Sequence, residues 1–216
     1  VRVDARQGWT NLCGTAGGSP DSGLSVSLHG NGIYPCARNG GNYHINFSDS
    51  YRLRRWFHLA YVFDASLPAN RAIQLFVDGE RRTPTLVHMG EKKPDGLPEG
   101  LGDLEFGPFG GAVAEIRIWR GALKAEEIGA WWWRELGDTH PRRQELAHRF
   151  AFNGALTDSV SGVSASLADV KLAADGPPLG DRDALAGLGI AMRSRYDFYT
   201  GGEAGELFGT TGDFNN

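Results

Sequence analysis

The stretch RWFHLAYVFD (residues 55–64) carries apolar side chains at both alternating sets of positions. A strand with one solvated face alternates apolar and polar residues, so we expect this stretch to be a central strand covered on both faces. The stretch IQLFVDG (residues 73–79) follows it and ends in Asp78-Gly79, two residues that tolerate positive φ. This pair predicts a tight hairpin between Val77 and Glu80.

Further short runs of β-forming residues lie on either side of these two stretches, each bounded by Gly, Asn, Asp or Pro. The 31 glycines follow no Gly-X-Y period and fit tight turns better than a collagen or a linker. Residues 89–102 predict a long surface loop, and residues 124–136 have the apolar spacing of one short helix. The chain is therefore expected to be all-β, with further strands at residues 9–16, 24–29, 43–47, 104–106 and 112–119.

The bulk properties exclude several classes of protein. The 216 residues have a formal net charge of −4 and no long basic run, which argues against a nucleic-acid partner. No stretch approaches 18 apolar residues, so membrane insertion is not expected. The sequence begins at Val1 without an apolar leader, and we interpret it as a processed or excised portion of a longer protein.

Three stretches in this order resemble the laminin-G-like and pentraxin-like jelly rolls of the concanavalin A-like lectin/glucanase superfamily. They are residues 55–64, residues 73–79, and AEIRIW (114–119) continuing to Ile128. The resemblance implies a jelly-roll β-sandwich of two antiparallel sheets with one short helix. Lys124 replaces the Ser that usually caps the helix, and Ala114 replaces an Asp that often precedes the Glu, which weakens any metal site.

Residues 148–162 resemble the opening strand and Asp-Ser loop of the same family, which normally come first. We therefore divide the chain into a main body, residues 1–136, and residues 147–216, which would complete the same sandwich by circular permutation. The alternative is that residues 147–216 begin a second tandem domain. A third interpretation is self-association, in which copies of the chain complete one another by strand complementation and form a structural subunit of a surface or fibre protein.

The sequence favours a noncatalytic protein. Glucanases of this fold place acidic residues two apart on one strand, and the Glu-x-Asp-x-x-Glu pattern is absent. Glu115 is expected to form an ion pair with Arg117. No Gly-x-Ser-x-Gly or Gly-x-x-x-x-Gly-Lys motif is present either, so neither a serine nucleophile nor a phosphate-binding loop is supported. A glycoside hydrolase is retained as a weaker alternative.

The resemblance implies a secreted or cell-surface binding or adhesion module whose partner is a glycan or an extracellular protein. Aromatic rings for sugar stacking, beside a polar side chain for the hydroxyls, are the expected binding groups. Such residues lie near predicted loops, although each could equally belong to the core. The candidates are Trp9, Tyr34, Asn42, Tyr43 and Tyr199.

Calcium is the one metal that the resemblance suggests, because related domains often hold this ion through loop oxygens. Asp158 is the best candidate ligand, with Asn153 and Glu115 assisting, against the alternative of solvated turn carboxylates. The only two cysteines, Cys13 and Cys36, suit either one disulfide of an exported protein or two buried free thiols.

Overall fold

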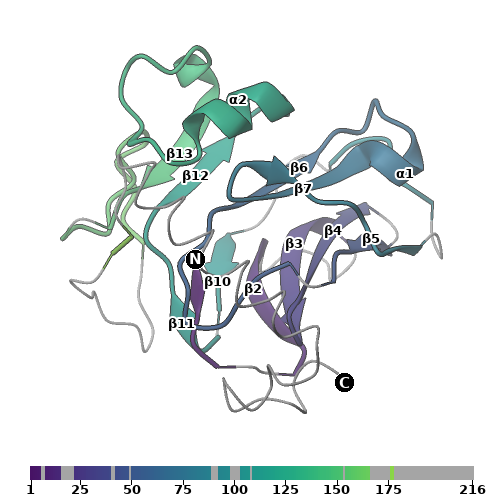
Figure 1. The fold of residues 1–216 in the computed structure, drawn as a ribbon. Coiled ribbons are helices and arrows are strands. Elements are labelled where there is room, and N and C mark those ends of the chain that lie inside the picture. The colour runs from purple at the N-terminus through teal and green to yellow at the C-terminus, as the bar shows by residue number, and fades with distance from the viewer. Residues whose placement is uncertain are drawn as a thin grey trace.

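We describe the protein from a computed structural model. The described residues are 1–5, 8–15, 22–39, 42–48, 50–88, 92–97, 103–107, 109–152, 154–165 and 176–177. Short antiparallel strands dominate this part of the chain, as the sequence predicts (Figure 1). None of the helices in it is long and apolar enough to cross a membrane.

The larger sheet has six antiparallel strands in the order β10-β2-β3-β4-β5-β9. Its strands follow the predicted runs closely, with two additions, β4 and β9, that the sequence did not predict. The bounds are β2 (Thr10–Thr15), β3 (Ser22–His29), β4 (Gly32–Asn39), β5 (Asn42–Asn46), β9 (Leu86–His88) and β10 (Leu104–Phe106).

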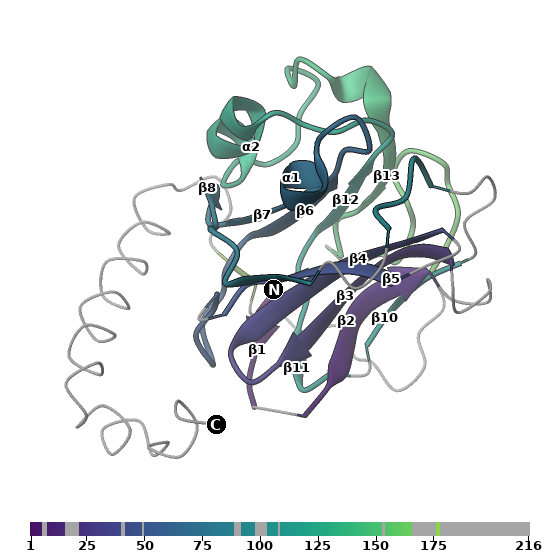
Figure 2. The same cartoon turned by 90° about the vertical axis from the view of Figure 1, so that its right-hand side faces the viewer.

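Smaller antiparallel groups make up the rest of the fold. β6 (Leu59–Phe63), β7 (Ile73–Val77) and β8 (Glu80–Arg81) form a three-stranded sheet, and β12 (Ile116–Trp119) pairs with β13 (Leu146–Phe150). β1 (Arg2–Val3) pairs with β11 (Gly111–Ala112). Figure 2 shows β6, β7, β12 and β13 as a layer above the six-stranded sheet. Helical segments are α1 (Ala69–Ala72), α2 (Ala125–Trp131) and a 3-10 turn (Arg143–Glu145).

The main core lies between these two layers. The six-stranded sheet contributes buried residues such as Leu28, Ile33 and Ile45, and β7 contributes Leu75 and Val77. All five bury apolar surface on folding, which is the main stabilising contribution to such a sandwich. We call the side of the six-stranded sheet that faces this core the inner face and the opposite side the outer face.

The β6–β7 hairpin is covered on both faces, as residues 55–64 predict. Its second face packs Val62 and Phe76 against Ile128 of α2. The turn is also confirmed, since Asp78 and Gly79 both have positive φ, 53° and 76°. The predicted central position of residues 55–64 differs from the structure: β7, not β6, is the middle strand of the three that are described there.

Three consecutive tryptophans at the end of α2 contact different parts of the molecule. Trp131 lies 4.7 Å from His140, ring centroid to centroid, and Trp133 lies beneath the guanidinium of Arg134. Trp132 lies so close over Gly79 that a Cβ there would meet its ring at 2.1 Å. Consecutive helical residues point about 100° apart, so Trp131 and Trp132 hold the end of α2 to two separate segments, around His140 and around Gly79.

Candidate ligand-binding face

The outer face of the six-stranded sheet follows from strand register. Val26 and Leu28 of β3 point into the core, so Ser27 and His29, which alternate with them along the strand, point outward. Cross-strand partners share a face, which places Asn11, the partner of Ser27 in β2, on the outer face. Tyr34, the partner of Ser27 in β4, lies there too.

Three rings gather at one end of this face. Trp9 stacks on His29 with ring centroids 4.7 Å apart and an interplanar angle of 17°. Tyr34 meets Trp9 at 4.6 Å with a tilt of 58°, and the centroids of His29 and Tyr34 are 6.4 Å apart. Trp9 is 67% exposed, far more than a core tryptophan. We call Trp9, His29 and Tyr34 the aromatic cluster.

Gly32 accounts for the position of Tyr34. Gly32 precedes Tyr34 by two residues on the same face of β4, and a Cβ at this glycine would lie 2.9 Å from the Tyr34 hydroxyl and 3.0 Å from its ring. The tyrosine ring therefore lies down over the glycine. Partial burial also raises the pKa of the Tyr34 hydroxyl above its usual value, so this group stays protonated at neutral pH.

The structure brings together two of the five predicted ligand-binding residues, Trp9 and Tyr34. A third, Tyr43, was a wrong prediction: it is 0% exposed on the inner face, and its hydroxyl donates to the Ala69 carbonyl. Asn42 pairs with Arg38 through the β4–β5 ladder, but its side chain lies outside the described structure. Tyr199 also lies outside the described residues.

Sequence reasoning missed His29 as a member of the aromatic cluster. The sequence feature that could have identified His29 is its position, because in an antiparallel pair the last residue of one strand lies opposite the first residue of the next. Trp9 directly precedes β2 and His29 ends β3, and the antiparallel β2–β3 register brings the two together. The register, and with it this contact, was not part of the sequence prediction.

The Asp158 carboxylate, the leading calcium candidate, is buried and bonded to four protein donors. Oδ1 accepts the backbone N–H groups of Arg149 at 2.8 Å and Val160 at 2.9 Å. Oδ2 lies 2.7 Å from His148 Nδ1 and also accepts the Ser161 hydroxyl. Burial alone would raise the pKa of the Asp158 carboxyl, but these hydrogen bonds hold it well below its usual value.

Glu115, the second candidate calcium ligand, lies between two arginines. Its carboxylate pairs with Arg117, as the sequence predicts, and accepts a hydrogen bond from Arg149 Nε at 2.8 Å. Arg117 and Arg149 are cross-strand neighbours in β12 and β13, so Glu115 offsets the repulsion between them.

These two carboxylates are therefore engaged by protein groups, and their donor sets fit a structural role better than calcium coordination. The third candidate ligand, Asn153, lies outside the described residues. Within the part of the chain that the structure describes, no group of three His, Cys, Asp or Glu side chains could hold a metal ion. Calcium binding stays an untested prediction.

Of the two alternatives that the sequence left open for the cysteines, the structure has free thiols, at both Cys13 and Cys36. They lie on β2 and β4 with β3 between them, so their Cα atoms are about 9.6 Å apart, beyond the roughly 7 Å that a disulfide can span. Cys13 pairs with inward-pointing Val26, whereas Cys36 pairs with outward-pointing Ser25. Burial raises the pKa of the Cys13 thiol to about 12, so this thiol stays protonated at neutral pH.

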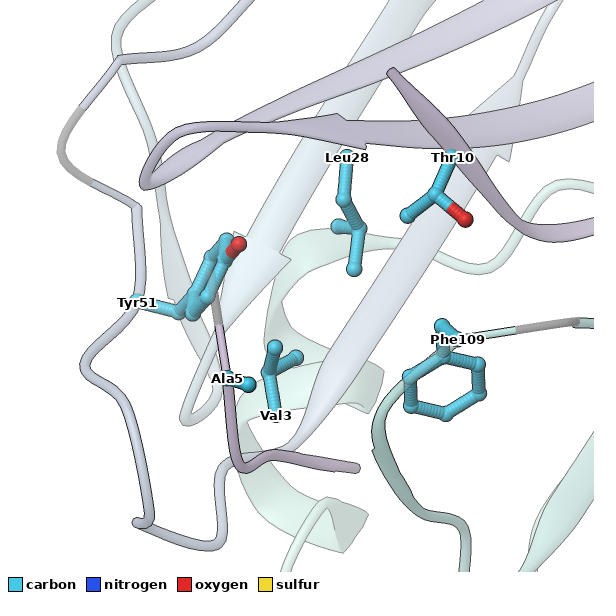
Figure 3. Close-up of a pocket in the computed structure, with 6 residues that line it drawn as sticks. All are labelled: Val3, Ala5, Thr10, Leu28, Tyr51 and Phe109. Atoms are coloured by element: carbon cyan, nitrogen blue, oxygen red, sulfur yellow. The ribbon is translucent and has the colours of Figure 1, made fainter. Parts of the chain in front are cut away.

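Figure 3 shows an apolar crevice on the core side of the molecule, next to β1. Its lining is mostly apolar but includes the hydroxyl-bearing side chains of Thr10 and Tyr51, and it has no room for a water-sized molecule. It is a gap in core packing and does not compete with the outer face as a ligand site. The lining residues are Val3, Ala5, Thr10, Leu28, Tyr51 and Phe109.

Comparison with known proteins identifies a family but no individual relative. The family model described as the concanavalin A-like lectin/glucanases superfamily matches residues 1–129. No curated protein and no solved structure matches the chain. The matched region contains all six strands of the larger sheet and the aromatic cluster on its outer face.

Proposed function

Because the chain belongs to the concanavalin A-like lectin/glucanase superfamily, we propose that it is a noncatalytic extracellular module that binds a glycan through the aromatic cluster. Membership of this superfamily supports a binding module in general terms. The choice of a glycan, and of an adhesion role in a secreted or surface protein, is our proposal.

The single observation that carries the proposal is the exposure of Trp9 within an organised set of rings. An isolated exposed tryptophan side chain rotates freely, and it would lose that conformational entropy when a ligand fixes it in one orientation. Stacking on His29 and contact with Tyr34 already restrain Trp9. A ring that is both exposed and held in place is a suitable surface for the apolar face of a sugar.

The neighbouring side chains support binding more than catalysis. β2 and β3 contain no Asp, Glu, Lys or Arg, so the surface beside the cluster offers neutral polar groups. A glycosidase needs two carboxylates about 5 to 10 Å apart on either side of the scissile bond. Among the described residues of the outer face, the only carboxylate is that of Glu105 in β10, two strands away from β3.

A glycan array comparing the wild-type protein with Trp9→Ala tests this function. Wild-type protein should bind a defined set of glycans, and Trp9→Ala should weaken that binding about 30-fold, as expected for loss of a central aromatic contact. Trp133→Ala is the matched control, because Trp133 contacts Arg134 far along the chain from the cluster.

The array should be repeated with a chelator. The proposal expects binding to survive it, since the aromatic cluster contains none of the candidate calcium ligands. An array on which wild-type protein binds nothing, or on which both tryptophan variants bind as wild type does, would contradict the proposed function.

A further inference from the structure

A polar pair lies directly beside the aromatic cluster on the outer face. Asn11 follows Trp9 by two residues on the same side of β2, a distance of about 7 Å along the strand. Its cross-strand partner is Ser27, which in turn lies opposite Tyr34. A ligand stacked on Trp9 or Tyr34 would therefore reach Asn11 and Ser27 without leaving the sheet surface.

The hydrogen bond between the two residues orients the amide of Asn11. Ser27 Oγ donates to Asn11 Oδ1 at 2.9 Å, which satisfies the oxygen end of the amide. The two N–H groups of Nδ2 are then directed away from Ser27. Asn11 is exposed, and no acceptor for Nδ2 is found among the described residues. The exposed group beside the aromatic cluster is thus a fixed hydrogen-bond donor.

We propose that Asn11 is a specificity-determining residue, whose Nδ2 donates to an acceptor oxygen of the saccharide stacked on the aromatic cluster, with Ser27 as its positioning residue. This inference rests on the proposed function and narrows it. The ligand class is an uncharged saccharide. A neutral amide donor suits a hydroxyl or ring oxygen. β2 and β3, which carry Asn11 and Ser27, contain no Lys or Arg to pair with an acidic sugar. Arg38 of β4 is on the outer face but four residues along the strand from Tyr34.

Asn11→Asp tests the donor without removing the hydrogen bond to Ser27. The carboxylate still accepts the Ser27 hydroxyl but has no N–H to offer a ligand. Titration calorimetry with a neutral oligosaccharide selected from the array should show about tenfold weaker binding. Ser27→Ala should give a smaller loss, because it keeps the donor and removes only its orientation.

Asn70→Asp is the matched control. Asn70 is exposed on α1 and undergoes the same change of charge outside the six-stranded sheet. It should bind the oligosaccharide as wild-type protein does. An equal loss of affinity in Asn70→Asp would mean that net charge alone explains the result, and would overturn the role of Asn11.

The outcomes separate this inference from the proposed function. If Trp9→Ala loses binding while Asn11→Asp keeps it, the role of Asn11 is overturned and the aromatic cluster stands. If both variants bind as wild type does, the inference and the proposed function are both overturned. Melting curves of all variants establish that each is folded, and the exposed position of Asn11 leads us to expect an unchanged melting temperature.

Discussion

At the scale of single residues, the candidate site depends on a glycine as much as on its aromatic rings. Tyr34 can lie flat on the sheet only because Gly32 has no side chain beneath it. The same glycine shows why the cluster is hard to recognise from sequence. Gly32 matters because it has no side chain, which leaves space for the Tyr34 ring. That space is relevant only if Gly32 and Tyr34 are on the same face of β4, which the sequence alone does not establish.

Gly32→Ala is predicted to weaken glycan binding by lifting the Tyr34 ring away from Trp9. The added methyl group would lie about 3 Å from the ring, closer than ordinary van der Waals contact. We expect a several-fold loss of affinity by titration calorimetry, with a changed near-UV circular dichroism spectrum.

The control for this change is Gly96→Ala, because a Cβ at Gly96 would have no atom within 4 Å. Unchanged affinity in Gly32→Ala would mean that the position of Tyr34 does not matter to the ligand. A loss of affinity in Gly96→Ala as large as that in Gly32→Ala would show that the effect is not local.

The sequence identifies aromatic residues near turns as candidates, but it does not show on which face of the sheet each one lies. Trp9 and Tyr34 were identified because large rings beside turns are candidates for stacking, but the same reasoning selected Tyr43. Only the register distinguishes them: Tyr43 pairs with inward-pointing Ala37, whereas Tyr34 pairs with outward-pointing Ser27. A slip of one residue in either strand would exchange the two faces.

At the scale of elements, β13 and the loop after it are held together by Asp158. Phe150 at the end of β13 forms an isolated bridge with Asp158, and the loop returns to bring Thr157 opposite Ser164. The likeness of residues 148–162 to an opening strand and Asp-Ser loop thus corresponds to a real local structure, in which the aspartate organises the backbone around it.

Asp158→Asn is predicted to destabilise this element, because an amide has only one oxygen to meet the donors around Asp158, and its N–H groups would face Arg149 or Ser161. Loss of a buried, charged acceptor should cost about 2 to 3 kcal/mol of the free energy of unfolding at neutral pH, measured by urea denaturation. An Asn variant as stable as wild type would contradict this role.

The pH dependence of stability gives an independent check. The pKa of Asp158 is depressed in the folded state, so the stabilisation is present above the unfolded-state value of about 4 and is lost as pH falls through the lower folded-state value. The difference in unfolding free energy between wild type and Asp158→Asn should therefore shrink in acid. A difference that is constant down to pH 2 would be inconsistent with this explanation.

Elements were predictable where local signals agreed, and were missed where they conflicted. The run at β7 and its Asp78-Gly79 turn were located closely. β4 was missed because Pro35 interrupts its apolar pattern and lacks an N–H. The pairing of β4 with β5 shows the effect of this proline. The continuous ladder begins only after it, at Cys36↔His44. Before it there is one isolated bridge, Ile33↔Phe47, and Pro35 itself is unpaired on that side.

At the scale of the whole molecule, the two-layer arrangement separates the candidate glycan site from the Asp158 loop. The aromatic cluster lies on the six-stranded sheet, on the side away from the core, whereas β12 and β13 belong to the opposite layer (Figure 2). β13, near the start of residues 147–216, pairs with β12 of residues 1–136 within one chain. The division into residues 1–136 and 147–216 stays a prediction, since most of the chain after residue 165 lies outside the described structure.

The most direct test of the outer-face site is to map a bound oligosaccharide by the amide chemical shifts of the ¹⁵N-labelled protein. Binding at the aromatic cluster should perturb the amides of residues 9–11, 27–29 and 32–34, on three adjacent strands of one sheet. Perturbations confined to residues 148–150 and 154–164, around Asp158 and the opposite layer, would contradict it.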